Sequence, residues 1–213
     1  MMDRRAFLAA SLTVASSLRW LRAGGLLAGD PIAVAAPAGP AGQPASAVFS
    51  AIVVALLPFD DPHFPLTPAQ VTAGAAKLTA LDNDAALQRN LALFDDLSAF
   101  AAPPDSLVAA EVAMYPPEQN EKGVASPGNA RVAADAHAYQ AQSAHWPAGA
   151  TSFRQLPLAD GRAYMMLWAH SSLGLRRRFY RSVKTLVMAA AYSMDAAWPA
   201  IGYAGPLLHA RTP

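Results

Sequence analysis

The sequence predicts an all-α protein, a small helical bundle that ends in an irregular C-terminal tail rich in aromatic residues, glycine and proline. Apolar residues recur at steps of three and four along several segments, which is the period of a helix with one buried face. Prolines and glycines separate these segments and mark turns. The only run compatible with a strand is 47–57, and a buried helix is the favoured interpretation there as well.

The first 35 residues have the layout of an export signal. Arg4 and Arg5 are followed, one residue on, by Phe7 and Leu8, and a mildly apolar stretch comes next. A basic start, a short apolar centre and small residues before a cleavage site are typical of secretory signals. Adjacent arginines mark a signal for the twin-arginine export route. A receptor recognises this signal, and the signal does not anchor the chain in the membrane. The apolar stretch is too short to span a bilayer core of about 30 Å. We therefore expect the twin-arginine translocase to export this chain, already folded, to the periplasm.

A linker and one domain are expected after the signal. Residues 36–46 are rich in proline, alanine and glycine, which is typical of a flexible linker, and 47–213 are expected to form a single helical domain. Small-x-small sites at 33–35 and at 45–47 are both candidates for cleavage. The sequence also leaves open a leader that is not removed, because charged residues separate the twin arginines from the first of these sites.

The first half of the domain is expected to contain three helices. The first, over 47–57, stops at a proline-rich loop. Thr67 as N-cap, with proline after it, predicts the second helix over 69–81. Asp84 is the predicted cap of the third helix, which extends to Phe100 and ends before two prolines. The inward-facing residues predicted for the second and third helices are Val71, Ala75, Leu78, Leu81, Leu87, Leu91, Phe94, Leu97 and Phe100.

The second half has a weak and a strong part. A short helix is expected over 107–115, then a loop insertion around 116–130, rich in proline and glycine, and another helix over 131–145. The strongest pattern covers 158–191, where Gly174 predicts a break between two helices. The apolar stripe of this last segment is Tyr164, Trp168, Leu175, Phe179, Val183, Leu186 and Val187.

Composition excludes several classes of function. Of the 16 basic and 15 acidic residues, four arginines and two aspartates lie in the leader, which leaves 12 basic against 13 acidic residues in the domain. Such a balance does not fit a nucleic-acid-binding protein, which needs a clearly basic domain. The chain has no cysteine. It therefore cannot itself attach haem c or hold a thiolate-bound zinc or a cysteine-ligated iron–sulfur cluster.

Motifs for catalysis are missing from the sequence. No Gly-x-Ser-x-Gly elbow occurs, and the glycines at 24–29 have the wrong spacing for a phosphate-binding loop. The histidines lack the spacing of a metal site. We expect them to be solvated, except His170, which is expected to pack or hydrogen-bond beside Trp168. The histidines are His63, His137, His145, His170 and His209.

Two pairs of carboxylates and one group of arginines have more than one interpretation. Asp95-Asp96 is expected on a solvated helix face, whereas Asp60-Asp61 in its proline-rich loop caps a helix or binds a partner. The arginines form either an ordinary exposed face, which we favour, or a patch that docks an anionic partner. They are Arg176, Arg177, Arg178 and Arg181.

The C-terminal block resembles the gluconate 2-dehydrogenase subunit 3 family, the small subunits of bacterial FAD-dependent sugar and alcohol dehydrogenase complexes. The likeness extends upstream through Trp168, Arg177-Arg178 and Lys184, and to the turn at 57–61. The twin-arginine start is a further feature of that family. The residues that carry the resemblance are Tyr192-Ser193, Trp198 and Ile201-Gly202-Tyr203-Ala204-Gly205-Pro206.

The resemblance implies a non-catalytic small subunit with no cofactor of its own. It implies that the chain binds a large FAD-dependent dehydrogenase subunit that lacks a signal, helps it mature and exports it through the twin-arginine route. FAD, and any iron–sulfur cluster or haem c, would belong to partner chains, among them a membrane cytochrome c subunit that would hold the complex at the membrane. The tail suits docking, because tyrosine and tryptophan are enriched at interfaces. The expected interface residues are Tyr192, Ser193, Trp198, Ile201, Gly202, Tyr203, Gly205 and Pro206.

Two other functions stay open at this stage. The chain could be a stand-alone exported helical protein whose apolar helices line a ligand pocket. It could also be a self-contained hydrolase that uses Asp60 or Asp61.

Overall fold

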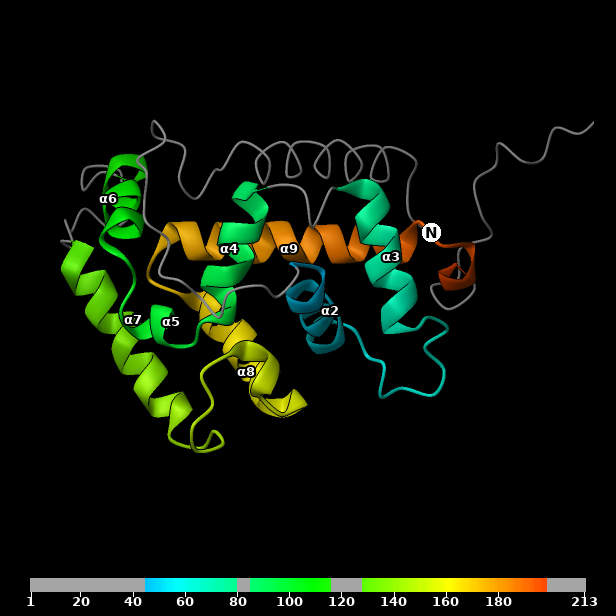
Figure 1. Ribbon diagram of the computed structural model, residues 1–213, viewed down its shortest axis with the longest axis horizontal. Coiled ribbons are helices and arrows are strands. Elements are labelled where there is room, and N and C mark those ends of the chain that lie inside the picture. Colours follow the sequence, from blue (N-terminus) through cyan, green and yellow to red (C-terminus); the bar gives the residue numbers. More distant parts are fainter. Residues whose placement is uncertain (1–44, 80–84, 116–127, 199–213) are drawn as a thin grey trace, which may run out of the picture.

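Every regular element in the described part of the chain is helical (Figure 1). The computed structural model describes residues 45–79, 85–115 and 128–198. Within these ranges the only β-type pairing is an isolated bridge between Asp96 and Ser152, so the all-α prediction is confirmed. The elements are α2 (Ala45–Leu56), α3 (Pro68–Leu78), α4 (Ala85–Asp95), α5 (Ser98–Ala101), α6 (Asp105–Met114), α7 (Gly128–Ser143), η2 (Phe153–Gln155), α8 (Leu158–His170), α9 (Gly174–Tyr192) and η3 (Asp195–Ala197).

Helix α9 is the element around which the others pack. It runs along the length of the molecule in Figure 1, with α6 and α7 beside its N-terminal end and α3 beside its C-terminal end. Helices α2 and α8 also contact it, and α7 joins α5, α6 and α8. The predicted stripe is confirmed, since each of its members is at most 1 % exposed. Gly174 begins α9, as the predicted break requires.

Aromatic rings fill the centre of the core. Phe94 of α4 has its ring centroid 4.8 Å from that of Phe153, 5.0 Å from Trp168 and 5.6 Å from Phe179. Tyr164 completes the group, and its hydroxyl donates to the carbonyl of Phe94 at 3.0 Å. Burial raises the pKa of Tyr164. Tilted and edge-to-face pairs of this kind add about 0.5–1.5 kcal/mol each beyond burial. The group joins α4, η2, α8 and α9.

The start of α3 follows the predicted cap. The side chain of Thr67 accepts from the backbone N–H of Gln70 at 3.3 Å, and the Gln70 side chain accepts from the Thr67 N–H at 2.8 Å. This capping box satisfies donors that the first turn of a helix leaves free. The helix ends at Leu78, earlier than predicted, with Thr79 in an extended conformation. Asp84, the predicted cap of the next helix, lies outside the described residues.

The third predicted helix is interrupted. It forms α4 and the short α5, because the backbone N–H of Leu97 donates to the Thr151 carbonyl instead of continuing one helix. The carboxylate of Asp96 then accepts from the backbone N–H of Ser98 at 2.9 Å and starts α5. A contact with a distant segment therefore divides a segment that is periodic in sequence.

Two predicted boundaries shift. Helix α7 begins at Gly128, so the last residues of the expected loop insertion around 116–130 are helical, and 116–127 lie outside the described part. Helix α2 begins at Ala45, inside the interval expected to be linker, because Ala45 is buried in the core. The leader is not described.

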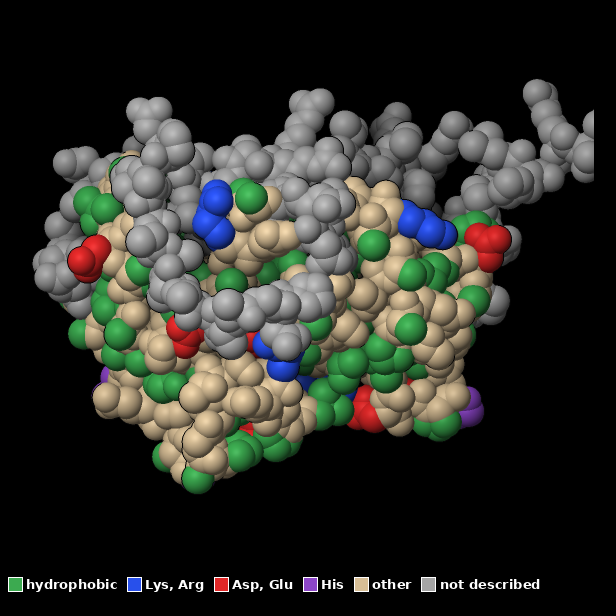
Figure 2. Space-filling model, viewed as in Figure 1, with side chains coloured by type: hydrophobic (Ala, Val, Ile, Leu, Met, Phe, Trp, Pro, Cys, Tyr) green, Lys and Arg blue, Asp and Glu red, His purple; other side chains and the backbone are tan. Residues whose placement is uncertain are grey.

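The described surface is sparsely charged. On the face shown in Figure 2, charged side chains stand singly among apolar and uncharged ones. Among the helices within the described ranges, none is long and apolar enough to cross a membrane.

Candidate functional site

The C-terminal end of α9 carries the described part of the predicted docking surface. Tyr192 is the last residue of α9 and is 44 % exposed. Ser193 follows it on the surface, and its hydroxyl donates to the Ala190 carbonyl at 2.8 Å. The indole N–H of Trp198 donates to the Tyr192 carbonyl at 2.9 Å. The Tyr-Ser pair and the tryptophan are therefore held together as one unit. Outside the described residues lie Ile201, Gly202, Tyr203, Gly205 and Pro206, and likewise Arg4, Arg5, Phe7 and Leu8.

An open hollow lies between this unit and α3. A Cβ added to Gly74 would come within 2.6 Å of the Met194 methyl group. The absence of a side chain at Gly74 therefore leaves the space that the Met194 side chain occupies. The hollow has a volume of about 470 Å³. It offers room for an apolar group, and Ser193 and Met194, the two residues after Tyr192, form one side of it. Its lining residues are Gln70, Ala73, Gly74, Lys77, Leu78, Ser193 and Met194.

A second open hollow, of about 410 Å³, lies between α7 and α8. Met166 at its edge is 48 % exposed, and Gln142 and His170 supply polar groups. The exposure of His170 corrects the expectation that it packs beside Trp168. The ring of Trp168 instead contacts other aromatic rings, those of Phe94, Phe100, Tyr164 and Phe179. His63, His137 and His145 are exposed, as expected, and His209 lies outside the described residues.

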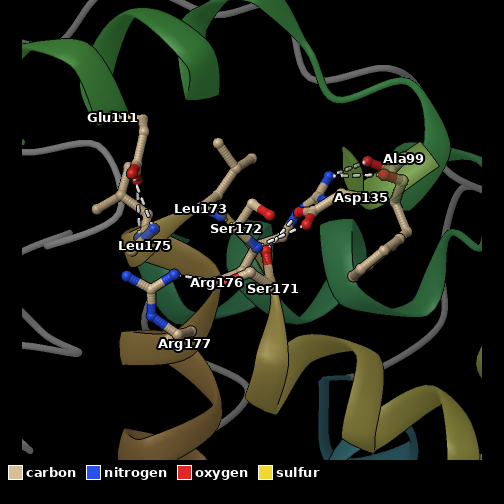
Figure 3. Close-up of polar contacts among 11 residues, drawn as sticks. Ala99, Glu111, Asp135, Ser171, Ser172, Leu173, Leu175, Arg176 and Arg177 are labelled. Atoms are coloured by element: carbon tan, nitrogen blue, oxygen red, sulfur yellow. Dashed lines mark hydrogen bonds and ion pairs between the residues drawn. The ribbon is translucent and has the colours of Figure 1, made fainter. Parts of the chain in front are cut away.

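Sequence reasoning missed a buried polar cluster at the other end of α9, formed by Glu111, Arg131, Asp135, Ser171 and Arg176. Figure 3 shows Glu111, Asp135, Ser171 and Arg176. The carboxylate of Glu111, from α6, accepts from the backbone N–H groups of Gly174 and Leu175 at 2.8 and 2.9 Å. It also pairs with Arg131 at 2.9 Å. The first turn of α9 has no acidic residue of its own. Glu111 therefore supplies the negative charge that the positive end of a helix dipole favours.

The second carboxylate of the cluster, Asp135 of α7, binds both the turn before α9 and its first residues. It accepts from the Ser171 hydroxyl, from the Ser172 backbone N–H at 2.6 Å and from the Arg176 guanidinium at 2.7 Å. Arg176 also donates to the carbonyls of Ala99 and Phe100, both at 2.9 Å. Its guanidinium lies 4.1 Å from the centroid of the Phe100 ring. The cluster thus joins α5, α6, α7 and the turn after α8 to the start of α9.

Two expectations about charged residues are wrong. Arg176, expected on an exposed face, is fully buried because Asp135 and two carbonyls bind it. Asp95, expected on a solvated face, is 6 % exposed and pairs with Arg154 at 2.9 Å. The signal in the sequence was an acidic residue flanked by apolar residues and alanines within a helix, as Glu111 and Asp135 are.

The proline-rich loop holds an ion pair on the surface. Asp60 pairs with Arg162 at 2.9 Å, and the side chains of the two are 57 % and 40 % exposed. The hydrogen bond from Arg162 lowers the pKa of Asp60, so this carboxylate is ionised at neutral pH. Asp61 accepts from the backbone N–H of His63 at 2.8 Å. Both carboxylates therefore shape the loop.

Within the described residues, no three metal-ligating side chains lie close enough together to hold an ion. Comparison with family models, with curated proteins and with solved structures finds no match to this chain.

Proposed function

We propose that this chain is a non-catalytic small subunit that binds a signal-less FAD-dependent dehydrogenase subunit, helps it mature and exports it folded through the twin-arginine route. The proposal combines the arginines at 4 and 5 with the resemblance of the tail to the gluconate 2-dehydrogenase subunit 3 family. In this proposal FAD, and any iron–sulfur cluster or haem c, belong to partner chains, and a membrane cytochrome c subunit is a further partner.

The observation that carries the proposal is the exposed Tyr192 at the end of α9, the longest of the described helices. Tyr192 is 44 % exposed, its carbonyl accepts a hydrogen bond from the indole N–H of Trp198, and the next two residues, Ser193 and Met194, line the hollow at Gly74. Tyrosine and tryptophan offer a large, stiff contact area with a polar group, and they dominate the binding energy of many interfaces. Tyr192, Ser193 and Trp198, the described residues among those that carry the resemblance, thus lie together at the C-terminal end of α9.

The test is export of the partner. In cells that express the full chain with the flavoprotein that co-purifies with it, Arg4→Lys combined with Arg5→Lys should leave both proteins in the cytoplasm, because the receptor reads the adjacent arginines. Arg19→Lys combined with Arg22→Lys is the matched control, and it should leave export unchanged. Flavin absorbance and immunoblots of the periplasmic and cytoplasmic fractions measure the outcome.

Normal arrival of the flavoprotein in the periplasm of the first double variant would contradict the carrier role. A chain that is exported alone, purifies as a monomer and binds a small apolar ligand at Met166 would instead support the stand-alone binding protein. The hollow between α7 and α8 is the feature that favours this second function.

A further inference from the structure

The solvent side of α9 carries a row of cations. We call Arg177, Arg181 and Lys184 the cationic row; Arg181 and Lys184 are exposed, and Arg177 is half-buried. At 3.6 residues per turn, these residues and the following Met188 and Tyr192 fall within an arc of about 80°. This arc lies opposite the buried stripe of the same helix.

The sequence around the cationic row contains no acidic residue that could neutralise its charge. Between Asp160 and Asp195 the sequence contains no Asp or Glu. Within the described residues, no ion pair involves Arg181 or Lys184. Ordinary solvated helix faces mix the two signs, and like charges three or four residues apart destabilise a helix. Repulsion within the row therefore destabilises α9, and no acidic side chain in the described part of the fold pairs with Arg181 or Lys184 to offset this repulsion.

The arginines have separate roles within this helix. Arg176 is buried in the polar cluster, and Arg178 lies over the ring of Tyr115, 5.4 Å from its centroid. Arg177 donates to the Ser171 carbonyl, which fixes the start of the row. Among the charged residues of α9, only Arg181 and Lys184 are exposed, and they lie between this fixed end and the exposed Tyr192.

We propose that the cationic row is a docking surface for an acidic patch on the flavoprotein subunit, an inference that rests on the proposed function. The row and Tyr192 form one continuous strip about 22 Å long, given a rise of 1.5 Å per residue. Complementary charge steers association, whereas buried aromatic side chains slow dissociation. The row thus guides the encounter, and the end of the helix at Tyr192 holds the complex.

A membrane surface fits the row less well than a protein does. Helices that bind a membrane surface bury an apolar face in it. The apolar face of α9 is already occupied, because Phe179, Val183 and Val187 are at most 1 % exposed within the core. Arginine, methionine and tyrosine are enriched in protein interfaces, which matches the composition of the strip.

The test measures association of the full chain with the purified flavoprotein at low and high salt. Arg181→Glu and Lys184→Glu should each lower the association rate roughly tenfold at low salt, with little change in the dissociation rate. The difference should disappear at high salt because salt screens exposed charges. Arg89→Glu, the same charge change on an exposed residue of α4, is the matched control and should leave both rates unchanged. Tyr192→Ala should instead raise the dissociation rate.

The outcomes separate the two proposals. If the unchanged chain does not bind the flavoprotein, both fail. If it binds, but Arg181→Glu and Arg89→Glu have the same effect, only the docking role of the row is overturned. Row-dependent binding to vesicles rich in phosphatidylserine, with unchanged flavoprotein association, would also overturn it in favour of a membrane surface. Circular dichroism of each variant confirms that the chain is folded.

Discussion

The guanidinium of Arg176 is buried, but it has a carboxylate and two carbonyl groups as hydrogen-bond partners. Burial lowers its pKa, and the charge of Asp135 acts in the opposite direction. Two of its nitrogens donate to Asp135 and to the carbonyls of Ala99 and Phe100. A buried ion pair adds little stability over a well-packed apolar pair, yet removing one partner leaves the other unpaired. Arg176 therefore fixes where α5 and α7 lie against α9.

Replacing Arg176 by methionine should lower the free energy of unfolding by about 3–5 kcal/mol, because Asp135 and two carbonyls lose their donor. The double change Arg176→Met with Asp135→Asn should cost less than the sum of the single changes, since the two residues interact. Urea unfolding measures both. Arg162→Met, which removes an exposed ion pair and a hydrogen bond to the Ala55 carbonyl, is the control and should lower the midpoint much less. An equal loss in Arg176→Met and Arg162→Met would contradict a structural role of the buried pair.

The buried charges are also where prediction from the sequence fails. An arginine next to two other arginines has the local pattern of an exposed face, and Asp95 beside Asp96 does as well. Their partners, Asp135 and Arg154, are far away along the chain. Local spacing therefore holds no information about them. The apolar stripe of α9, in contrast, depends only on helical period and was predictable residue by residue.

At the scale of the elements, the first turn of α9 is stabilised by a residue of another helix, Glu111 of α6. Three arginines follow Leu175, and cations are unfavourable at the positive end of a helix dipole. The carboxylate of Glu111 lies against the first two N–H groups and is fully buried. Helix α6 therefore acts as the cap of α9, a role that residues within a helix or just before it usually have.

Glu111→Gln should lower the free energy of unfolding by about 2 kcal/mol, because the amide keeps an acceptor but loses the charge. The amides of Gly174 and Leu175 should exchange with deuterium faster, while amides in the middle of α9 keep their rates relative to global unfolding. Asp105→Asn removes an exposed acid from the same helix and serves as the control. Unchanged exchange at Gly174 and Leu175 in Glu111→Gln would refute the capping role.

Helix boundaries were predictable where they depend on local chemistry. Thr67 followed by a proline, and the break at Gly174, are signals within a few residues, and both predicted the observed helix starts. The end of α4 was not predictable, because it depends on a hydrogen bond from Leu97 to Thr151. The candidate docking unit was predictable in part. Tyr192 and Trp198 came from a resemblance, whereas the hollow at Gly74 comes only from the packing of α3 on α9.

On the scale of the whole molecule, the helices differ in how firmly they join the core. Helix α2 buries six residues, among them Phe49, Ile52 and Val53. Helix α6 buries only Leu107 and Glu111, and its Val112 is 45 % exposed. Because local stability follows buried apolar contacts, the two ends of the molecule should not open together. The end formed by α6 should open first, and it is remote from the predicted docking unit at Tyr192.

Native-state hydrogen exchange should show this order. Amides of α6 should exchange through a local opening at a free energy below that of global unfolding, whereas amides of α2 and of the middle of α9 should exchange only through global unfolding. Glu111→Gln should lower the opening free energy of α6 further, because the carboxylate is its main polar link to α9. The hollow at Gly74 should stay protected in that variant, since α3 packs on the opposite end of α9. If amides of α6 exchanged only at the global rate, the molecule would open as one unit, and the docking unit could not remain folded while the far end opens.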